Sequence, residues 1–293
     1  MDISVIIVSY NTSGLLRDCL DSIRRCTSGV DYEVIVVDND SHDGTPDMLR
    51  RDYPWVRLIE SGGNLGFGRA NNLGSEAARG KYLLYLNSDT ILRNNALRIM
   101  WEYAESPEGA DTGVIGAILL DAQGQPCHSY GRFITPRREL KNVVAKYLRF
   151  LKDPELLHPS PVEAPKDVEY ITGAMMMVPR KVYESIGGFD PDFFMYCEEV
   201  DWQLRMSQHG LRRVVIPGPE VVHLEGGSAG GGGKGRWSVG RSANMHASLK
   251  TYLRKHHGKS YKLFRPLYLL LNTPSILLMG IKDPVYLKLL GKQ

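Results

Sequence analysis

The residues best suited to chemistry follow an apolar run, Lys81–Leu86, which has the composition of a strand buried on both faces of a parallel sheet. A polar cluster, Asn87-Ser88-Asp89-Thr90, comes directly after this run. Ligands of open α/β sheets bind just beyond the carboxyl ends of the strands. A carboxylate at such a place can hold a divalent cation, which in turn can hold a diphosphate. Asp89 is therefore a candidate metal ligand, although it could also start a turn or cap a helix that opens near Asn94.

A second acidic cluster, Glu198, Glu199 and Asp201, lies at the predicted start of a helix. The N-terminal end of a helix dipole favours negative charge, which accounts for two of these acids. Three acids within four residues, after an apolar and aromatic lead-in, exceed what a helix start needs, so the cluster favours a functional site. Asp201 and Arg205 are spaced at i and i+4, which predicts a structural ion pair between them.

The elements that must position these acids alternate between strands and helices. Four apolar runs have the length and composition of strands, namely Ile3–Val8, Glu33–Val37, Val56–Ile59 and Lys81–Leu86. Strands and helices that alternate in this way predict right-handed βαβ units and a parallel sheet. Polar residues follow the first strand as Ser9-Tyr10-Asn11 and the second as Asp38-Asn39-Asp40, as they do at Asp89.

A glycine-rich segment, GGNLGFGRANNLG at residues 62–74, lies between the third and fourth predicted strands. Its glycines allow a ligand to approach the backbone closely, and its asparagines, Asn64 among them, offer amide contacts. The G-x-G-x-x-G order of a dinucleotide fingerprint is absent, and the first βα turn carries Ser-Tyr-Asn instead of glycines. The sequence therefore argues against a classical dinucleotide dehydrogenase.

The second half of the chain adds further elements. The expected helices are Asn94–Glu105 and Arg137–Lys152, and the expected strands are Val114–Leu120, Val168–Val178, Arg213–Ile216 and Glu220–Leu224. The small residues Gly173 and Ala174 leave space beside the sheet for a ligand. The basic face of helix 137–152 is either an ordinary solvated face or a surface for anionic lipid or a lipid diphosphate.

Two features mark the C-terminal part. Residues 226–235 contain seven glycines and end at Lys234 and Arg236, which describes either a flexible linker or a mobile lid with cations for a diphosphate. A basic helix, Ser238–His257, precedes the apolar stretch Leu267–Ile281, which Asn-Thr-Pro interrupts. This stretch is shorter than the roughly 20 residues that a helical span requires. We therefore expect residues 262–282 either to pack as helices or to attach peripherally to an anionic membrane surface.

Composition argues against several classes of protein. A net charge of +3 over 293 residues does not indicate nucleic-acid binding, and four cysteines without a C-x-x-C pair indicate neither a zinc site nor a disulfide framework. That number of cysteines suits a reducing compartment. The first strand begins at Ile3 and leaves no room for a signal peptide, so we expect a cytoplasmic protein, free or at the inner face of the cell membrane.

With these motifs in order, residues 3–258 resemble the family-2 inverting glycosyltransferases of GT-A fold, and most of all the rhamnosyltransferase-like branch that acts on bacterial cell-surface polysaccharides. The resemblance implies an α/β fold, in which a Rossmann-like, mixed and mainly parallel nucleotide-binding sheet is flanked by helices and followed by a C-terminal helical extension. It divides the GT-A domain, 1–258, into a nucleotide-sugar-binding half, 1–125, and an acceptor-binding half with a lid, 126–258. The tail is 259–293.

The resemblance also assigns roles to single residues. Asp38 stands at the family's nucleobase-binding aspartate, and Asn64 lies in its second nucleotide-side loop. Asp89 stands at the end of the metal-binding D-x-D motif, whose first aspartate is Asn87 here, a departure common in this branch. His223 matches the histidine that completes the metal site, and the implied cofactor is Mg²⁺ or Mn²⁺.

The implied reaction is an inverting transfer in which Glu199 is the general base. Glutamate replaces the family's usual aspartate at this position, so the reach to the acceptor grows by one methylene. Further residues complete the expected donor-binding set (Ser9, Asn11, Lys234 and Arg236) and the expected acceptor side (Gly173, Ala174, Glu198 and Asp201).

The expected donor is a pyrimidine nucleoside-diphosphate sugar, since Asp38 can accept the imide N–H of uracil or thymine. The branch favours dTDP-L-rhamnose, with a saccharide or lipid-linked saccharide as acceptor, while UDP-dependent galactofuranosyl or N-acetylhexosaminyl transfer stays open. A nucleotidyltransferase would need a glycine-rich triphosphate signature, which the first turn lacks. A catalytically silent sugar-nucleotide-binding protein would be expected to lose the acid at 89 or 199, and both acids are present.

Overall fold

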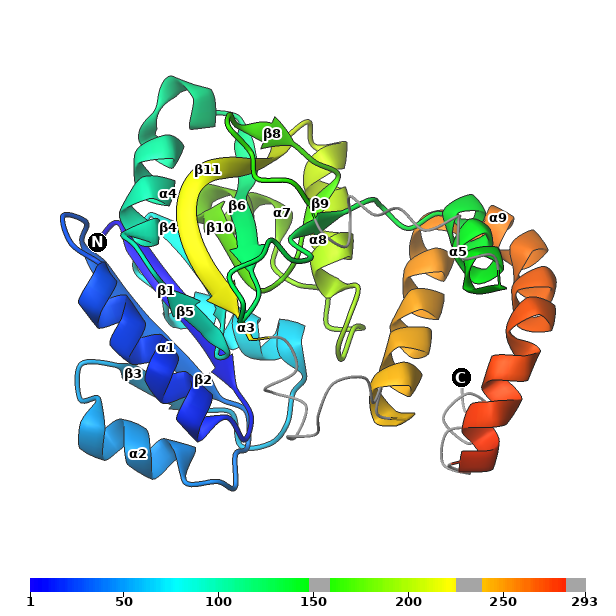
Figure 1. The fold of residues 1–293 in the computed structure, drawn as a ribbon, viewed down its shortest axis with the longest axis horizontal. Coiled ribbons are helices and arrows are strands. Elements are labelled where there is room, and N and C mark those ends of the chain that lie inside the picture. Colours follow the sequence, from blue (N-terminus) through cyan, green and yellow to red (C-terminus); the bar gives the residue numbers. More distant parts are fainter. Residues whose placement is uncertain (148–158, 225–238, 283–293) are drawn as a thin grey trace.

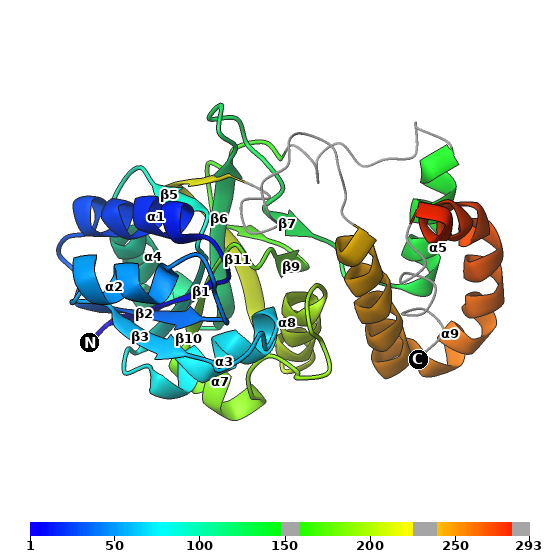
Figure 2. The ribbon, with the colours of Figure 1, turned by 90° about the horizontal axis from the view of Figure 1, so that it is seen from below.

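The structure is a computed structural model that describes residues 1–147, 159–224 and 239–282. A central sheet carries helices on both faces, and two helical arms lie beside it (Figures 1 and 2). The strand order in the sheet is β3-β2-β1-β4-β10-β6-β11-β5, with β8 paired to β11. This mixed, mainly parallel α/β sheet with a C-terminal helical extension confirms the fold class that the sequence implies.

Four parallel strands form the N-terminal half, β1 (Ile3–Ser9), β2 (Tyr32–Asp38), β3 (Arg57–Glu60) and β4 (Tyr82–Asn87). Three helices connect them, α1 (Ser13–Cys26), α2 (Thr45–Asp52) and α3 (Phe67–Ala77). β1 pairs in parallel with both β2 and β4, and the register aligns Ser9 with Asp38 and Val8 with Asn87. The carboxyl ends of β1, β2 and β4 therefore lie level at one edge of the sheet.

The second half extends the sheet with β5 (Thr90–Leu92), β6 (Thr112–Leu120), β8 (Lys166–Asp167), β10 (Met175–Pro179) and β11 (Arg212–His223). Its helices are α4 (Ala96–Glu105), the short η1 (Pro107–Gly109), α5 (Pro136–Tyr147), α7 (Arg180–Ile186) and α8 (Glu198–Gln208). β7 (Tyr130–Gly131) and β9 (Tyr170–Ile171) form a separate two-stranded sheet.

Each face of the sheet has its own apolar core, because side chains alternate between the faces along a strand. Val5 and Ile7 of β1 face the core that α1, α2 and α4 cover, while Ile6 faces the core beneath α3, α7 and α8. Figure 2 shows these two helical layers on opposite sides of the sheet. In the second core Trp202 of α8 is fully buried and packs against Phe189, so the start of α8 is fixed to the sheet.

The strands of the second half differ from the sequence prediction in three ways. The expected strand Val168–Val178 is broken at residues 172–174 into β9, which pairs with β7 in the small sheet, and β10, which pairs with β4 and β6 in the central sheet. The two expected strands Arg213–Ile216 and Glu220–Leu224 are one strand, β11, whose register shifts between Ile216 and Val221. The short strands β5, β7 and β8 have no counterpart in the prediction.

The C-terminal helix α9 (Val239–Lys282) bends at His257, where the backbone leaves helical geometry, and so forms two arms. The first arm contains the predicted basic helix, and the backbone of the second stays helical through the predicted apolar stretch. Leu249, Leu253 and Phe264 make a small core between the arms and Leu140 of α5. None of the helices in the described ranges is both long enough and apolar enough to cross a bilayer.

Candidate active site

Hydroxyl groups tie the carboxyl ends of β1 and β4 together. The hydroxyls of Ser9 and Thr12 lie 2.9 Å apart, and Thr12 donates to the hydroxyl of Ser88 at 3.1 Å. All three residues are buried, so this chain of hydrogen bonds holds the Asn87–Asp89 turn against β1. Ser9, expected to contact the donor, contributes to this support, and Thr12 and Ser88 join it as residues that the sequence did not single out.

Asp38 presents a buried carboxylate oxygen without a partner at the end of β2. The side chain is 2% exposed, and its Oδ2 accepts the backbone N–H of Ser41 at 3.0 Å. Its Oδ1 makes no hydrogen bond within the described residues. A buried acceptor that makes no hydrogen bond costs free energy, so this oxygen is suited to accept an N–H from a ligand.

Three asparagines fix the loops around Asp38. The Oδ1 of Asn11, whose backbone is left-handed, accepts the backbone N–H of His42 at 2.7 Å, so Asn11 holds the loop after β2. The amide of Asn39 donates to Asn64 Oδ1 at 3.0 Å, and its own oxygen accepts the N–H of Leu65 at 2.9 Å. Asn39 was not among the predicted site residues, although it directly follows Asp38 at a buried strand end.

Asp89 and His223 meet at the end of the sheet. Asp89 precedes β5, and β5 pairs antiparallel with β11 so that Thr90 lies opposite His223. The Oδ1 of Asp89 lies 3.3 Å from Nε2 of His223, but the geometry is not that of a hydrogen bond, and this buried oxygen has no other partner in the described part of the chain. The Nδ2 of Asn87 lies 3.3 Å from the same imidazole nitrogen. The fold thus brings Asn87 and Asp89 together with His223, which is 136 residues further along the chain than Asn87.

The chemistry of this pair fits a divalent cation. A carboxylate oxygen and an imidazole nitrogen are common metal ligands, and Mg²⁺ is usually held by one or two carboxylates together with substrate phosphates. Within residues 1–147, 159–224 and 239–282, no group of three or more His, Cys, Asp and Glu side chains could hold a metal ion. Asp89 and His223 would therefore need oxygens of a bound diphosphate to complete the coordination.

The acid pair Glu198–Glu199 opens α8 after two left-handed residues, Tyr196 and Cys197. Glu198 is 4% exposed, and its Oε2 has no hydrogen-bond partner in the described residues. Burial, together with the charge of Glu199, raises the pKa of Glu198 well above its ordinary value. Glu199 keeps some contact with solvent, and burial among protein atoms raises its pKa to about 7. A carboxylate with that pKa can accept a proton near neutral pH.

The segment before α8 is clamped onto α3. The N–H of Phe67 donates to the carbonyl of Phe194 at 2.9 Å, and the amide of Asn72 pairs with the backbone of Phe189 at 2.7 and 2.9 Å. A Cβ placed on Gly66 would lie 2.0 Å from the Phe194 carbonyl oxygen, so only glycine allows this approach. These contacts place the acid pair next to the start of α3. A Cβ added to Gly68 would lie 3.5 Å from the Cβ of Glu198.

The remaining predicted residues are distributed as follows. Asp201 is 1% exposed, forms the predicted ion pair with Arg205 at 3.0 Å, and contacts His256 of α9 at 2.7 Å. The ring of Phe67 would lie 3.3 Å from a Cβ on Gly173 and so fills the space expected there, while Ala174 is buried beside Asn87. Lys234, Arg236 and the expected lid at 226–235 lie outside the described residues.

Comparisons with known proteins identify a matching family model, related sequences and a related fold. The family model described as "Glycosyl transferase family 2" matches residues 4–158. The N-acetylglucosaminyl-diphospho-decaprenol L-rhamnosyltransferase of Mycobacterium tuberculosis is 27% identical over 277 residues, which cover 86% of this chain and 84% of that protein. The rhamnosyltransferase WbbL of Escherichia coli K12 is 26% identical over 226 residues, which cover 75% of this chain and 82% of that protein.

A solved structure, GalNAc-T7 with UDP, GalNAc and Mn²⁺, shares the fold with a TM-score of 0.59 at 17% identity. The match covers 86% of this chain and 48% of that one, so this chain spans about half of the solved protein. At this identity the likeness bears on the fold alone.

Proposed function

This chain belongs to glycosyl transferase family 2, and from that premise we propose that it moves L-rhamnose from dTDP-L-rhamnose, with inversion, to a hydroxyl of a saccharide or lipid-linked saccharide. Relatives named rhamnosyltransferases support the choice of sugar. The name of the mycobacterial relative includes a diphospho-decaprenol, which supports a lipid-linked acceptor. The observation that carries the proposal is the set of buried acidic oxygens without hydrogen-bond partners in the described residues, on Asp38, Asp89 and Glu198.

Donor binding begins at the ends of β1, β2 and β4. The free Oδ1 of Asp38 accepts the imide N–H of thymine or uracil, a contact that cytosine, with no imide proton, does not offer. Asn11, Asn39 and Asn64 act by holding the surrounding loops in place. This contact suits thymine and uracil alike.

Asp89 and His223 would hold the metal ion against the donor diphosphate. When bound, Mg²⁺ or Mn²⁺ supplies positive charge that stabilises the departing nucleoside diphosphate. The buried Asp89 carboxylate has its place fixed by the Ser9–Thr12–Ser88 chain, and His223 has its place fixed by the β5–β11 pairing. The two side chains thus require little rearrangement when the donor binds.

Glu199 acts as the general base. It takes the proton from the acceptor hydroxyl as that oxygen attacks the anomeric carbon, while the bond to the diphosphate breaks on the opposite face of the sugar. One carboxylate is enough, since an inverting transfer forms no glycosyl-enzyme intermediate. Burial and the charge of Glu199 raise the pKa of Glu198 well above its ordinary value, so Glu198 keeps its proton and leaves Glu199 as the base of the pair.

We also assign peripheral membrane contact to the second arm of α9. Leu263, Leu267 and Leu270 are 86%, 44% and 70% exposed, and their spacing puts them on one side of the helix. Lys259 and Lys262 lie nearby on the same arm and can contact anionic headgroups. This attachment would bring the enzyme to a lipid-linked acceptor.

A nucleotide screen tests the assignment of the donor. The melting temperature of the protein is measured with dTDP, UDP, GDP and ADP, each with Mn²⁺ and with chelator. We expect dTDP and UDP to raise the melting temperature in Mn²⁺ and to do so much less in chelator. Hydrolysis assays with dTDP-L-rhamnose and UDP-sugars then separate the two pyrimidine donors. A shift with GDP or ADP alone would contradict the assignment of a pyrimidine donor.

A further inference from the structure

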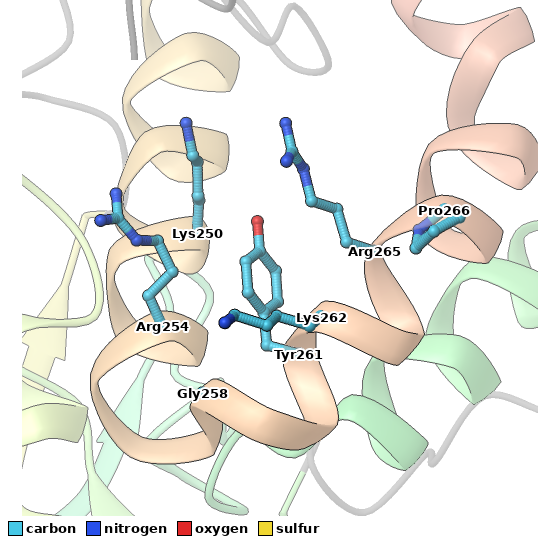
Figure 3. Close-up of a pocket in the computed structure, with 7 residues that line it drawn as sticks. All are labelled: Lys250, Arg254, Gly258, Tyr261, Lys262, Arg265 and Pro266. Atoms are coloured by element: carbon cyan, nitrogen blue, oxygen red, sulfur yellow. The ribbon is translucent and has the colours of Figure 1, made fainter.

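A cavity of about 440 Å³ lies between the two arms of α9, next to the bend at His257. Four of the residues that line it are cationic, two from the first arm (Lys250 and Arg254) and two from the second (Lys262 and Arg265). Tyr261 lies between them, and Figure 3 shows its hydroxyl flanked by the side chains of Lys250 and Arg265, whose charged ends point the same way. The described lining residues include no acid.

The fold holds these cations together against their repulsion. The bend at His257 reverses the chain, and the Nε2 of this residue lies 3.0 Å from the carbonyl of Ile134. The core of Leu249, Leu253 and Phe264 then fixes the arms to each other and to α5. Burial and the nearby charges of Arg265 and Arg254 lower the pKa of Lys250. An anion bound in this concave pocket would therefore reduce the repulsion between the cations and stabilise the folded protein.

The pocket has the size and symmetry for more than one phosphoryl group. Its volume is of the order of a small-molecule site. Arginine binds phosphate oxygens through a planar pair of N–H groups and lysine through a point charge, and each arm supplies one residue of each kind. Two phosphoryl groups could therefore each be contacted from both arms.

We propose that this pocket binds the diphosphate group of a lipid. A lipid is favoured over a soluble diphosphate because the same arm exposes Leu263, Leu267 and Leu270. Helical periodicity puts these leucines on a different side of the arm from Lys262 and Arg265, so apolar contact and diphosphate binding do not compete. That the lipid is the glycosyl acceptor rests on the proposed function, whereas the binding of a diphosphate does not.

Titration with inorganic pyrophosphate, in chelator and without nucleotide, tests the site itself. The pocket variant is Arg254→Gln with Arg265→Gln, and the matched control is Lys141→Gln with Lys181→Gln, which removes two exposed cations from α5 and α7 outside the pocket. We expect the pocket variant to bind pyrophosphate about tenfold more weakly or worse, because charge-assisted hydrogen bonds are lost. The control should change the affinity less than about twofold.

Vesicles distinguish the source of the diphosphate. Phosphatidylcholine vesicles are compared with the same vesicles carrying a tenth of phosphatidylglycerol or a tenth of a polyprenyl diphosphate. The full-length wild-type protein should bind the diphosphate vesicles more tightly than the phosphatidylglycerol vesicles, and the pocket variant should lose that difference. Equal binding of both proteins to the diphosphate vesicles, with weaker pyrophosphate binding by the variant, would overturn the lipid assignment and leave a site for a soluble diphosphate.

Pyrophosphate binding that is the same in wild type and the pocket variant would overturn the site as a whole. Circular dichroism of both variants checks that they fold. Neither binding assay contains donor, so a failure of sugar transfer would count against the proposed function and not against this pocket. If the proposed function and the pocket assignment both hold, the pocket variant should have a higher KM for a lipid-diphosphate acceptor and an unchanged KM for the donor.

Discussion

At the scale of single residues, the site depends on carboxylates that are buried without the partners that usually accompany them. Asp38, Asp89 and Glu198 each keep one such oxygen in the described structure. Burying acceptors in this way is costly for folding, and the cost is recovered when a ligand supplies the missing donor or cation. The electrostatics of the free protein therefore already favour an N–H donor at Asp38 and a cation at Asp89.

Because the pKa of Glu199 is raised, the rate of sugar transfer and the stability of the fold should depend on pH in opposite directions. Its folded-state pKa is raised from 4.5 to about 7, so the folded protein holds a proton that the unfolded chain releases at lower pH. The free energy of unfolding that this proton contributes is fully present below pH 4.5 and is lost as the pH rises through 7. Sugar transfer needs the deprotonated base, so kcat/KM should rise over the same range.

Melting temperatures and rates from pH 5 to 8, for wild type and for Glu199→Gln, measure both effects. The melting temperature of wild type should fall relative to that of the variant as the pH rises. A rate that levels off near pH 5, or a relative melting temperature that rises, would show that Glu199 titrates normally.

The metal pair gives a second prediction at this scale. Asp89→Ala and His223→Ala should each weaken Mn²⁺-dependent binding of the nucleoside diphosphate by roughly tenfold or more, since each removes a ligand. Asp47→Ala and His209→Ala, both exposed, serve as controls with the same loss of side chain. Calorimetric titration with and without chelator measures the effect. Full sugar transfer in excess chelator would contradict the metal assignment of both residues.

At the scale of elements, the contact between the α3 loop and the α8 lead-in joins the donor side to the acid pair. Gly66 has φ of +81°, and a Cβ there would overlap the carbonyl of Phe194. Gly66→Ala should therefore displace the lead-in and destabilise the protein by about 1–3 kcal/mol. It should also lower activity, because Glu199 follows this segment.

Two neighbouring glycines provide controls for Gly66→Ala. Gly62 also has positive φ but open space around its Cα, so Gly62→Ala isolates the backbone cost, and Gly63→Ala tests a site with neither constraint. Denaturant unfolding should rank the destabilisation Gly66 > Gly62 > Gly63. A Gly66→Ala protein as stable as the Gly62→Ala protein would mean that the contact with Phe194 has little energetic effect.

The sequence predicted those elements whose pattern is contained in a short, continuous stretch of residues. The runs before Asn11, Asp38 and Asp89 are buried strands with polar ends, and parallel pairing brings such ends together without further information. The contact of Asp89 with His223 could not be obtained from spacing, because it depends on the short strand β5 and its pairing with β11. The resemblance to a family supplied that assignment instead.

Other parts of the site could not be predicted from short stretches of sequence, because they also depend on contacts between distant residues. Nothing in the sequence near Gly66 indicates that its neighbour in space is Phe194, and the break at residues 172–174 arises because β9 pairs with β7 while β10 pairs with β4 and β6. Likewise, the spacing of Asp201 and Arg205 predicted their ion pair, but the third partner, His256, comes from α9. Long-range packing, not composition, decided these features.

At the scale of the whole molecule, α9 connects the acid pair to a possible membrane surface. Its first arm is fixed to the α8 region through Asp201–His256, through the hydroxyl of Ser248, which donates to the Met195 carbonyl at 2.7 Å, and through Tyr252, which is buried beside Cys197. The second arm presents the exposed leucines. Attachment through that arm would place the catalytic domain at a fixed height above the lipid.

Flotation with vesicles that contain anionic lipid tests this attachment. Wild-type protein should float, and Leu263→Gln with Leu270→Gln should float less, because about 1.5–3 kcal/mol is lost for each buried leucine. Tyr10→Gln with Phe194→Gln, which also removes two exposed aromatic side chains but outside α9, is the control. Should wild type stay at the bottom of the gradient, the second arm is a packing element and not a membrane contact.

Cleavage of dTDP-L-rhamnose by wild type and by Glu199→Gln is the most direct test of the central claim, that a single carboxylate, Glu199, drives an inverting transfer from a bound sugar nucleotide. In Mn²⁺, Glu199→Gln should bind dTDP about as tightly as wild type but turn over about 100-fold more slowly or worse. Glu184→Gln, an exposed glutamate on α7, should retain both properties. Near-normal turnover by Glu199→Gln, with turnover abolished in Asp201→Asn, would contradict the claim and assign the base to Asp201.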